Sequence, residues 1–172
     1  KGIDLLVKAF AKASKELDDV KLVIVGPDDG YLGKLKKLIN VLGIENNILI
    51  TGPLYGRDKL EAYVDSSIVV CPSIYGIFDL VPIEAAMVGK ALIVSNLPTY
   101  GFSDYVAKGG FGLLVNPYEL DKLKEAMITL IQNEKLSRVL GEKARSYALK
   151  NLTISRTVDL LEKSYLDVIS SK

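Results

Sequence analysis

Two patterns of hydrophobic residues alternate along the chain. Short runs in which every residue is apolar predict strands that are buried on both faces of a parallel sheet. These runs are 21–25, 48–51, 68–71, 91–95 and 112–115. Between them, apolar residues recur at every third or fourth position, which predicts amphipathic helices. These segments are 3–17, 32–42, 56–67 and 82–89. This alternation is typical of a doubly wound α/β fold, a Rossmann-like parallel sheet of about five or six strands with helices on both faces.

The C-terminal third follows a different pattern. Asn116, Pro117 and Glu119 have the spacing of a helix start, with Asn116 as the capping residue and Pro117 at the first helical position. Two further helices are predicted at 134–150 and 155–169, and no strand separates them. We expect these extra helices to pack on the sheet or on a neighbouring domain.

Composition narrows the possible functions. With 172 residues, 49% apolar and 25% charged, the chain has the make-up of a single globular domain spanning residues 1–172. The net charge of +1 gives no electrostatic reason to expect a nucleic acid partner. There is no histidine, and the one cysteine, Cys71, lies in an apolar run that predicts a core position. No apolar run reaches the length of a transmembrane segment, and the cytosol is the simplest compartment. Because the first residue is Lys1 and not methionine, we expect a piece of a longer protein.

Three loops are expected at the edge of the sheet where ligands of open α/β folds bind, beyond the carboxyl ends of the strands. Residues 26–30, "GPDDG", allow close approach of the backbone to a ligand, although a simple turn explains them equally well. Residues 51–56, "TGPLYG", also have ordinary turn chemistry.

The third loop, 72–84, leads into a helix that we expect to start near Val81. The free N–H groups at such a start can bind a phosphate without a metal ion. Glu84, which we place in the first turn, has a carboxylate that can accept two hydrogen bonds from a ribose diol. It can equally serve only to complement the helix dipole.

Five motifs, in order and spacing, resemble the C-terminal, nucleotide-binding domain of retaining glycosyltransferases of family 4, which have the GT-B fold. They are "KGIDLLVKAF", "KLVIVGPDDG", "NNILITGPL", "PSIYGIFDLVPIEAAMVGKALIVS" and "GFGLLVNP". The resemblance covers nearly the whole chain. It implies transfer of a sugar from a UDP-, GDP- or ADP-sugar to an unknown acceptor, with retention of anomeric configuration and without a cofactor or metal.

The resemblance also implies roles for individual residues. Lys1 would contact the donor diphosphate, Glu84 the ribose, and Leu54 the base. The donor-binding set is Lys1, Gly26, Pro27, Asp28, Leu54, Ile77, Phe78, Asp79, Leu80, Val81 and Glu84. No catalytic residue is assigned within the chain. The acceptor would bind an N-terminal domain that the chain lacks, so we expect no turnover by this part alone. The protein would be cytoplasmic, either free or peripherally associated with the cytoplasmic face of a membrane through that domain.

Two positions depart from the family pattern. Gly76 stands where the family has a glutamate that contacts the sugar, and Asp79 stands where it has a glycine. A degenerate nucleotide-binding or subunit-interaction module therefore remains an alternative, and a GT-B epimerase a more distant one. A dehydrogenase is disfavoured because no G-x-G-x-x-G motif opens a strand–helix unit. We expect position 76 to tolerate a side chain unless its φ is positive.

Overall fold

A computed structural model describes residues 1–76 and 79–170 of the chain. Its five strands lie where the apolar runs predicted them. They are β1 (Leu22–Val25), β2 (Ile48–Gly52), β3 (Ile68–Cys71), β4 (Ala91–Ser95) and β5 (Gly112–Val115). All strand pairs are parallel, so the predicted α/β class is confirmed.

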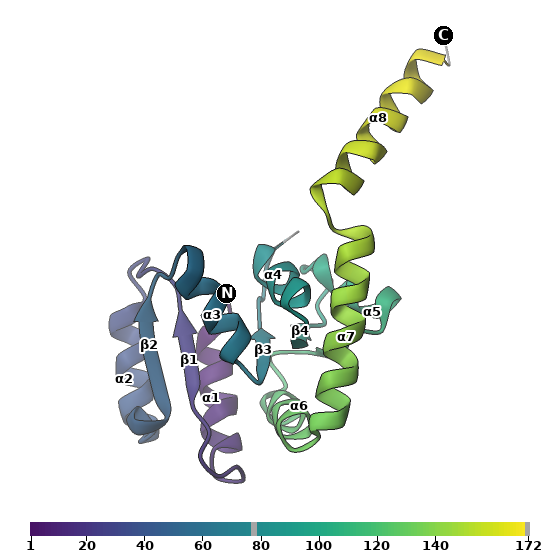
Figure 1. Ribbon diagram of the computed structural model, residues 1–172. Helices are drawn as coiled ribbons and strands as arrows, with labels where there is room; N and C mark the ends of the chain where they lie inside the picture. Colours follow the sequence, from purple (N-terminus) through teal and green to yellow (C-terminus); the bar gives the residue numbers. More distant parts are fainter. Residues whose placement is uncertain (77–78, 171–172) are drawn as a thin grey trace.

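Helices follow or precede each strand (Figure 1). They are α1 (Ile3–Ala13), α2 (Leu32–Leu42), α3 (Gly56–Asp65), α4 (Leu80–Val88), α5 (Phe102–Gly109), α6 (Leu120–Gln132), α7 (Glu134–Asn151) and α8 (Ile154–Ser170), with a 3-10 turn η1 (Glu45–Asn47). The short helix α5 was not predicted, although Phe102, Tyr105 and Val106 have helical spacing, because eight residues show only about two turns of the pattern.

Three predicted boundaries were wrong. Helix α1 ends at Ala13, although Leu17 still reaches the core, where it is 7% exposed. Helix α4 begins at Leu80, two residues before Pro82. Asn116 does not cap α6, whose capping residue is Glu119. The Asn116 side chain instead accepts a hydrogen bond from the Tyr118 N–H at 3.1 Å, which closes a turn ahead of the helix.

The strands form two ladders, β1–β2 and β3–β4–β5. Among the described residues, β1 pairs with β2 alone and β3 with β4 alone, so β1 and β3 each keep one unpaired edge. Figure 1 shows these two strands next to each other with the N-terminus of the chain between them. The sheet is thus interrupted at its centre.

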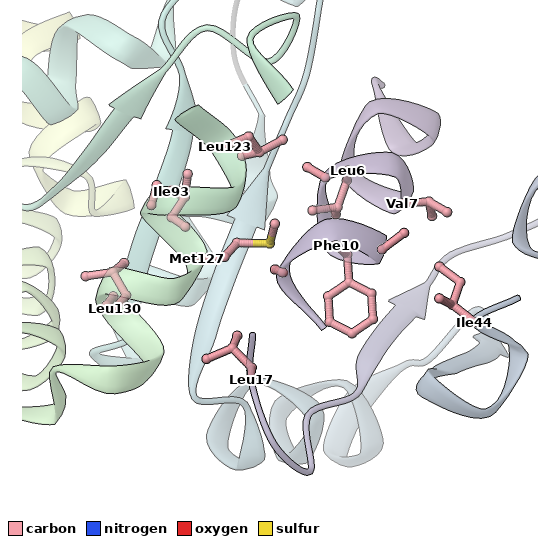
Figure 2. Packing of buried hydrophobic residues seen from close by; sticks show 14 of the residues in the cluster. Leu6, Val7, Phe10, Leu17, Ile44, Ile93, Leu123, Met127 and Leu130 are labelled. Carbon is pink, nitrogen blue, oxygen red and sulfur yellow. The ribbon is translucent and has the colours of Figure 1, made fainter. Parts of the chain in front are cut away.

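Two helical layers enclose the strands. Helix α1 packs against α2 and α6 in one layer, and α4 packs against α3 and α7 in the other. Figure 2 shows the core of the first layer, in which Leu6 of α1 points toward Leu123 of α6 and the Phe10 ring lies between Leu17 and Ile44. This layer joins the two ladders, because among the described residues no strand pairing does.

Helix α8 is different from the rest. It projects away from the body beyond the end of α7 (Figure 1), and none of its described residues is buried. The expectation that all C-terminal helices pack on the sheet or a neighbour therefore holds within this chain for α6 and α7 only.

Candidate donor-binding site

The three predicted loops do lie beyond the carboxyl ends of β1, β2 and β3, which share one edge because the strands are parallel (Figure 1). Helix α4 starts at this same edge. Its capping residue, Asp79, makes no side-chain bond to the helix, and Leu80 and Val81 are 66% and 47% exposed. The first N–H groups of α4 therefore lie at the surface, where the positive end of the helix dipole favours an anion.

Glu84 lies in the second turn of α4, because the helix begins earlier than predicted. The first turn holds no acidic residue, so the reading of Glu84 as a first-turn complement to the dipole is wrong. Its Oε1 accepts a hydrogen bond from Lys59 Nζ at 2.8 Å, and its Oε2 accepts one from the Tyr63 hydroxyl at 3.0 Å. We call Glu84, Lys59 and Tyr63 the Glu84 cluster.

Lys59 and Tyr63 are four residues apart on α3, which places them on the same face of that helix. The Glu84 side chain is 34% exposed, so its carboxylate is held in place and still reaches solvent. Burial and the bond to Glu84 raise the pKa of Tyr63, which keeps the phenol protonated as a donor. The sequence analysis missed both partners, although their spacing on an amphipathic helix was a usable signal.

A second carboxylate lies five residues earlier. Asp79 Oδ1 accepts a hydrogen bond from Lys1 Nζ at 2.5 Å, and Asp79 Oδ2 accepts one from Ser73 Oγ at 2.8 Å. We call these three residues the Asp79 cluster. It brings Lys1 to the start of α4 from 78 residues away. Lys1 and Asp79 were each predicted as site residues, but Ser73 was not.

Gly2 makes this approach possible. Its φ is +73°, and a Cβ at this position would lie 2.1 Å from the carbonyl oxygen of Pro72. Only glycine fits such a close approach in this backbone conformation. The start of the chain is therefore seated directly on the loop after β3, with Lys1 beside it.

Gly76 has a φ of +150°. We expected position 76 to tolerate a side chain unless its φ was positive, so a side chain there is strained. The residue is fixed by its N–H, which donates to the Thr99 carbonyl at 3.0 Å. A Cβ at Gly76 would lie 3.9 Å from Asp79 Oδ1 and 3.8 Å from the Tyr100 ring. The carboxylate of Asp79 thus lies close to where a side chain at position 76 would begin.

The remaining predicted residues are less informative. Asp28 Oδ1 accepts hydrogen bonds from the N–H groups of Gly30 and Leu32, so the side chain organises the turn into α2. Those backbone bonds hold the pKa of Asp28 below its usual value. Gly26 and Leu54 are half-buried at the same edge, and Pro27 is exposed. Ile77 and Phe78 lie outside the described residues.

Among the described residues, the requirements of a reactive cysteine, a three-ligand metal site and a membrane-spanning helix are not met. Cys71 is 5% exposed and burial raises the pKa of its thiol to about 12, so the predicted core role is confirmed. Within residues 1–76 and 79–170, no three His, Cys, Asp or Glu side chains are grouped as metal ligands. None of the helices in that part of the chain has the length and apolar character that a membrane crossing needs.

Comparison with known proteins agrees with the sequence-based resemblance. An exopolysaccharide phosphotransferase from Streptomyces coelicolor is 33% identical over 145 residues, which is 84% of this chain and 15% of that protein. A poly(ribitol-phosphate) alpha-N-acetylglucosaminyltransferase from Staphylococcus aureus is 28% identical over 171 residues, 99% of this chain and 33% of that protein. The chain therefore spans a third or less of these two relatives.

Solved structures show the same fold. Sucrose-phosphate synthase from Thermosynechococcus elongatus aligns with a TM-score of 0.84 and 23% identity, over 100% of this chain and 43% of that one. The Anabaena protein HepE, in complex with UDP and glucose, aligns with a TM-score of 0.80 and 22% identity, over 98% of this chain and 44% of that one. The family model described as glycosyl transferases group 1 matches residues 1–147. The chain belongs to this family of glycosyltransferases and has the α/β architecture of the C-terminal half of a GT-B fold.

Proposed function

We propose that this chain is the donor-binding domain of a retaining glycosyltransferase, which takes a sugar from a nucleotide-sugar and passes it to an acceptor bound elsewhere in the protein. One observation carries the proposal. Lys1, 78 residues away from Asp79 in sequence, lies beside the exposed start of α4, and Glu84 lies in the second turn of the same helix, so all three are at the edge of the sheet beyond β3.

Each part of this arrangement suits one part of a nucleotide-sugar. The start of α4 and Lys1 offer N–H donors and positive charge to the diphosphate. The Glu84 carboxylate has acceptor capacity left for the two ribose hydroxyls, because each of its oxygens has two lone pairs and accepts one hydrogen bond, from Lys59 or from Tyr63. The UDP in the Anabaena complex makes a uridine nucleotide a reasonable first ligand to test.

The chemistry asked of these groups is charge stabilisation. When the bond from the sugar to the diphosphate breaks, negative charge builds up on the departing phosphate. Donors that are already in place stabilise that charge without reorganising during the reaction. Lys1 and the N–H groups of α4 are such donors, and no metal ion is needed in this scheme.

The proposal includes further polypeptide around the chain. A strand that precedes α1 and joins it to β1 by a right-handed crossover would lie beside β1 on the side away from β2. This is the side of β3, where both strands have unpaired edges among the described residues. Such a strand would complete a single sheet in the order typical of a doubly wound fold.

Helix α8 supports the same conclusion. Ile154, Val158, Leu161 and Tyr165 recur every three or four residues on one side of this helix, and each is at least 45% exposed. An apolar stripe of this kind is stable when another surface covers it. We propose that the acceptor-binding domain, absent from this chain, provides that surface.

Calorimetric titration of the protein with UDP, GDP and ADP, with EDTA and then with magnesium, tests the donor site. We expect one of the three to bind in EDTA. Binding that requires magnesium or manganese would contradict the proposed phosphate site, and no binding of any nucleotide would refute the function. A nucleotide that binds, together with a full-length protein that transfers sugar from no donor, would favour a degenerate binding module, which is the alternative that Gly76 suggests.

A further inference from the structure

Asp79 stands at the capping position of α4 but does not cap it. Aspartate at this position usually accepts a hydrogen bond from a backbone N–H in the first turn. Here both carboxylate oxygens are used elsewhere, by Lys1 and by Ser73. The carboxylate therefore lies beside the free helix start without satisfying any of its donors.

The Asp79 carboxylate is held firmly in this position. Its side chain is 15% exposed, whereas that of Lys1 is 70% exposed. Ser73, which donates the second hydrogen bond, is 4% exposed. A Cβ at position 76 would lie 3.9 Å from Asp79 Oδ1, at ordinary van der Waals distance. The anion is thus held by buried surroundings, and the cation is the more solvent-exposed partner.

The charge of Asp79 persists at neutral pH. Burial disfavours its ionised form, but the hydrogen bonds from Lys1 and Ser73 outweigh burial and hold its pKa below the ordinary value. The neighbouring Tyr100 and Cys71 have raised pKa values and remain neutral. Lys1 and Asp79 together add no net charge to the site that the proposed function assigns to a diphosphate.

We propose that Asp79 is a fixed counter-anion in the donor site, which weakens binding of the nucleoside diphosphate left after transfer more than it weakens binding of the nucleotide-sugar. This inference rests on the proposed function. A nucleotide-sugar carries about two negative charges on its phosphates, and a free nucleoside diphosphate carries about three at neutral pH, because its terminal phosphate ionises a second time. The repulsion from Asp79 grows with the charge of the ligand, so the product is penalised more than the donor.

This arrangement has a consequence for turnover. A site built only from Lys1 and a helix start would bind the product more tightly than the donor, since the product has the larger charge. A carboxylate at the same place reduces the difference in affinity between the product and the donor. Asp79 would thereby favour release of the leaving nucleotide without removing the donors that stabilise it during transfer.

The test compares two ligands in one variant. Asp79→Asn keeps the size of the side chain and removes its charge. We expect the dissociation constant of UDP, or of whichever nucleoside diphosphate binds, to fall about tenfold, and that of the matching UDP-sugar about fivefold, in proportion to three charges against two. The donor dissociation constant divided by the product dissociation constant should therefore rise about twofold, and product inhibition should become stronger by the same factor.

Two further variants serve as controls. Asp121 pairs with Lys12 at 2.7 Å between α6 and α1 and belongs to neither cluster, so Asp121→Asn makes the same change in net charge without altering the Asp79 cluster. It should leave both dissociation constants unchanged. Ser73→Ala removes one anchor of Asp79 but keeps the charge, and it should leave the ratio of the two constants unchanged.

Three outcomes would overturn the inference. If Asp79→Asn weakens both ligands, Asp79 contacts the ligand directly and is not a counter-anion. If it tightens both equally, or if Asp121→Asn has the same effect, the larger penalty on the product does not arise from the charge of Asp79. If no nucleotide binds to the unmodified protein or to any variant, the proposed function itself fails.

Discussion

Two carboxylates flank the start of α4, and they have similar partners but different settings. Glu84 accepts hydrogen bonds from a lysine and a tyrosine, and Asp79 accepts them from a lysine and a serine. The Glu84 side chain is 34% exposed, more than twice the 15% of Asp79. Glu84 therefore keeps access to a ligand, whereas Asp79 acts on a ligand mainly through its charge.

The origin of the partners also differs. Both partners of Glu84 come from one helix, α3, at a spacing of four residues. The partners of Asp79 come from the first residue of the chain and from the loop after β3. The first cluster depends on local helical geometry, and the second depends on how Gly2 and Pro72 bring distant segments together.

The largest expected effect is on Glu84. Glu84→Gln should weaken nucleotide binding by about 1–3 kcal/mol, the range for hydrogen bonds to a charged group. The amide has a single acceptor oxygen, so it cannot serve both ribose hydroxyls. Titration calorimetry measures the change. The matched control is Glu61→Gln on α3, where the pair with Arg57 is exposed. If Glu84→Gln and the unmodified protein bound the nucleotide equally well, Glu84 would not contact the ribose.

The next largest effect is expected on protein stability, from a substitution of Gly76, which lies beside Asp79. Gly76→Glu should lower the free energy of unfolding by about 1–3 kcal/mol, because its φ of +150° strains any side chain. The new carboxylate would also start near Asp79 Oδ1, which adds repulsion between like charges. Urea denaturation measures the loss.

The control for Gly76 is Gly33→Ala in α2, a position with open space around it and no positive φ. Alanine there should stabilise the protein by up to about 1 kcal/mol, since it is the better helix former. If Gly76→Glu were as stable as the unmodified protein, the conformation of this loop would be wrong.

A substitution of Lys59, the partner of Glu84, should have a smaller effect on nucleotide binding. Lys59→Met should weaken nucleotide binding only about twofold to threefold, because Lys59 orients Glu84 through an ion pair that is partly exposed. Arg57→Met is the control, because Arg57 lies six residues before Tyr63 on α3 and pairs with Glu61, and it should not change nucleotide binding. Tighter binding in Lys59→Met would mean that Lys59 competes with the ribose for Glu84.

Features that depend on local sequence pattern could be predicted, and features that depend on tertiary contacts could not. All five strands were predicted, because each is a continuous apolar run. Of the Glu84 cluster, Glu84 was named both from its place near a predicted helix start and from the family resemblance. Lys59 and Tyr63 were missed, although their spacing of four residues on α3 is a helical pattern. The bond between Lys1 and Asp79 could not be predicted, since a contact across 78 residues depends on tertiary structure. The φ of Gly76 was likewise unknown, because glycine adopts either sign.

The smallest expected effect is on pH dependence, and it isolates Asp79. The pKa of Asp79 is lowered in the folded protein, so its contribution to stability is present above the unfolded value of about 3.9 and is lost as pH falls through the folded value. We expect the difference in unfolding free energy between the unmodified protein and Asp79→Asn to be about 1 kcal/mol or less at pH 6, because Lys1 is exposed. This difference should become smaller as pH falls below about 4, because the lowered pKa places the loss below the unfolded value. Asp121 and Asp28 also have lowered pKa values, and the subtraction removes their contributions because both remain in the variant. Urea denaturation at pH 3, 4, 5 and 6 measures the difference. A constant difference across that range would show that the ionised carboxylate is not the source of the stability, and the Asp79 cluster would then resemble a neutral hydrogen-bonded anchor more than a fixed charge.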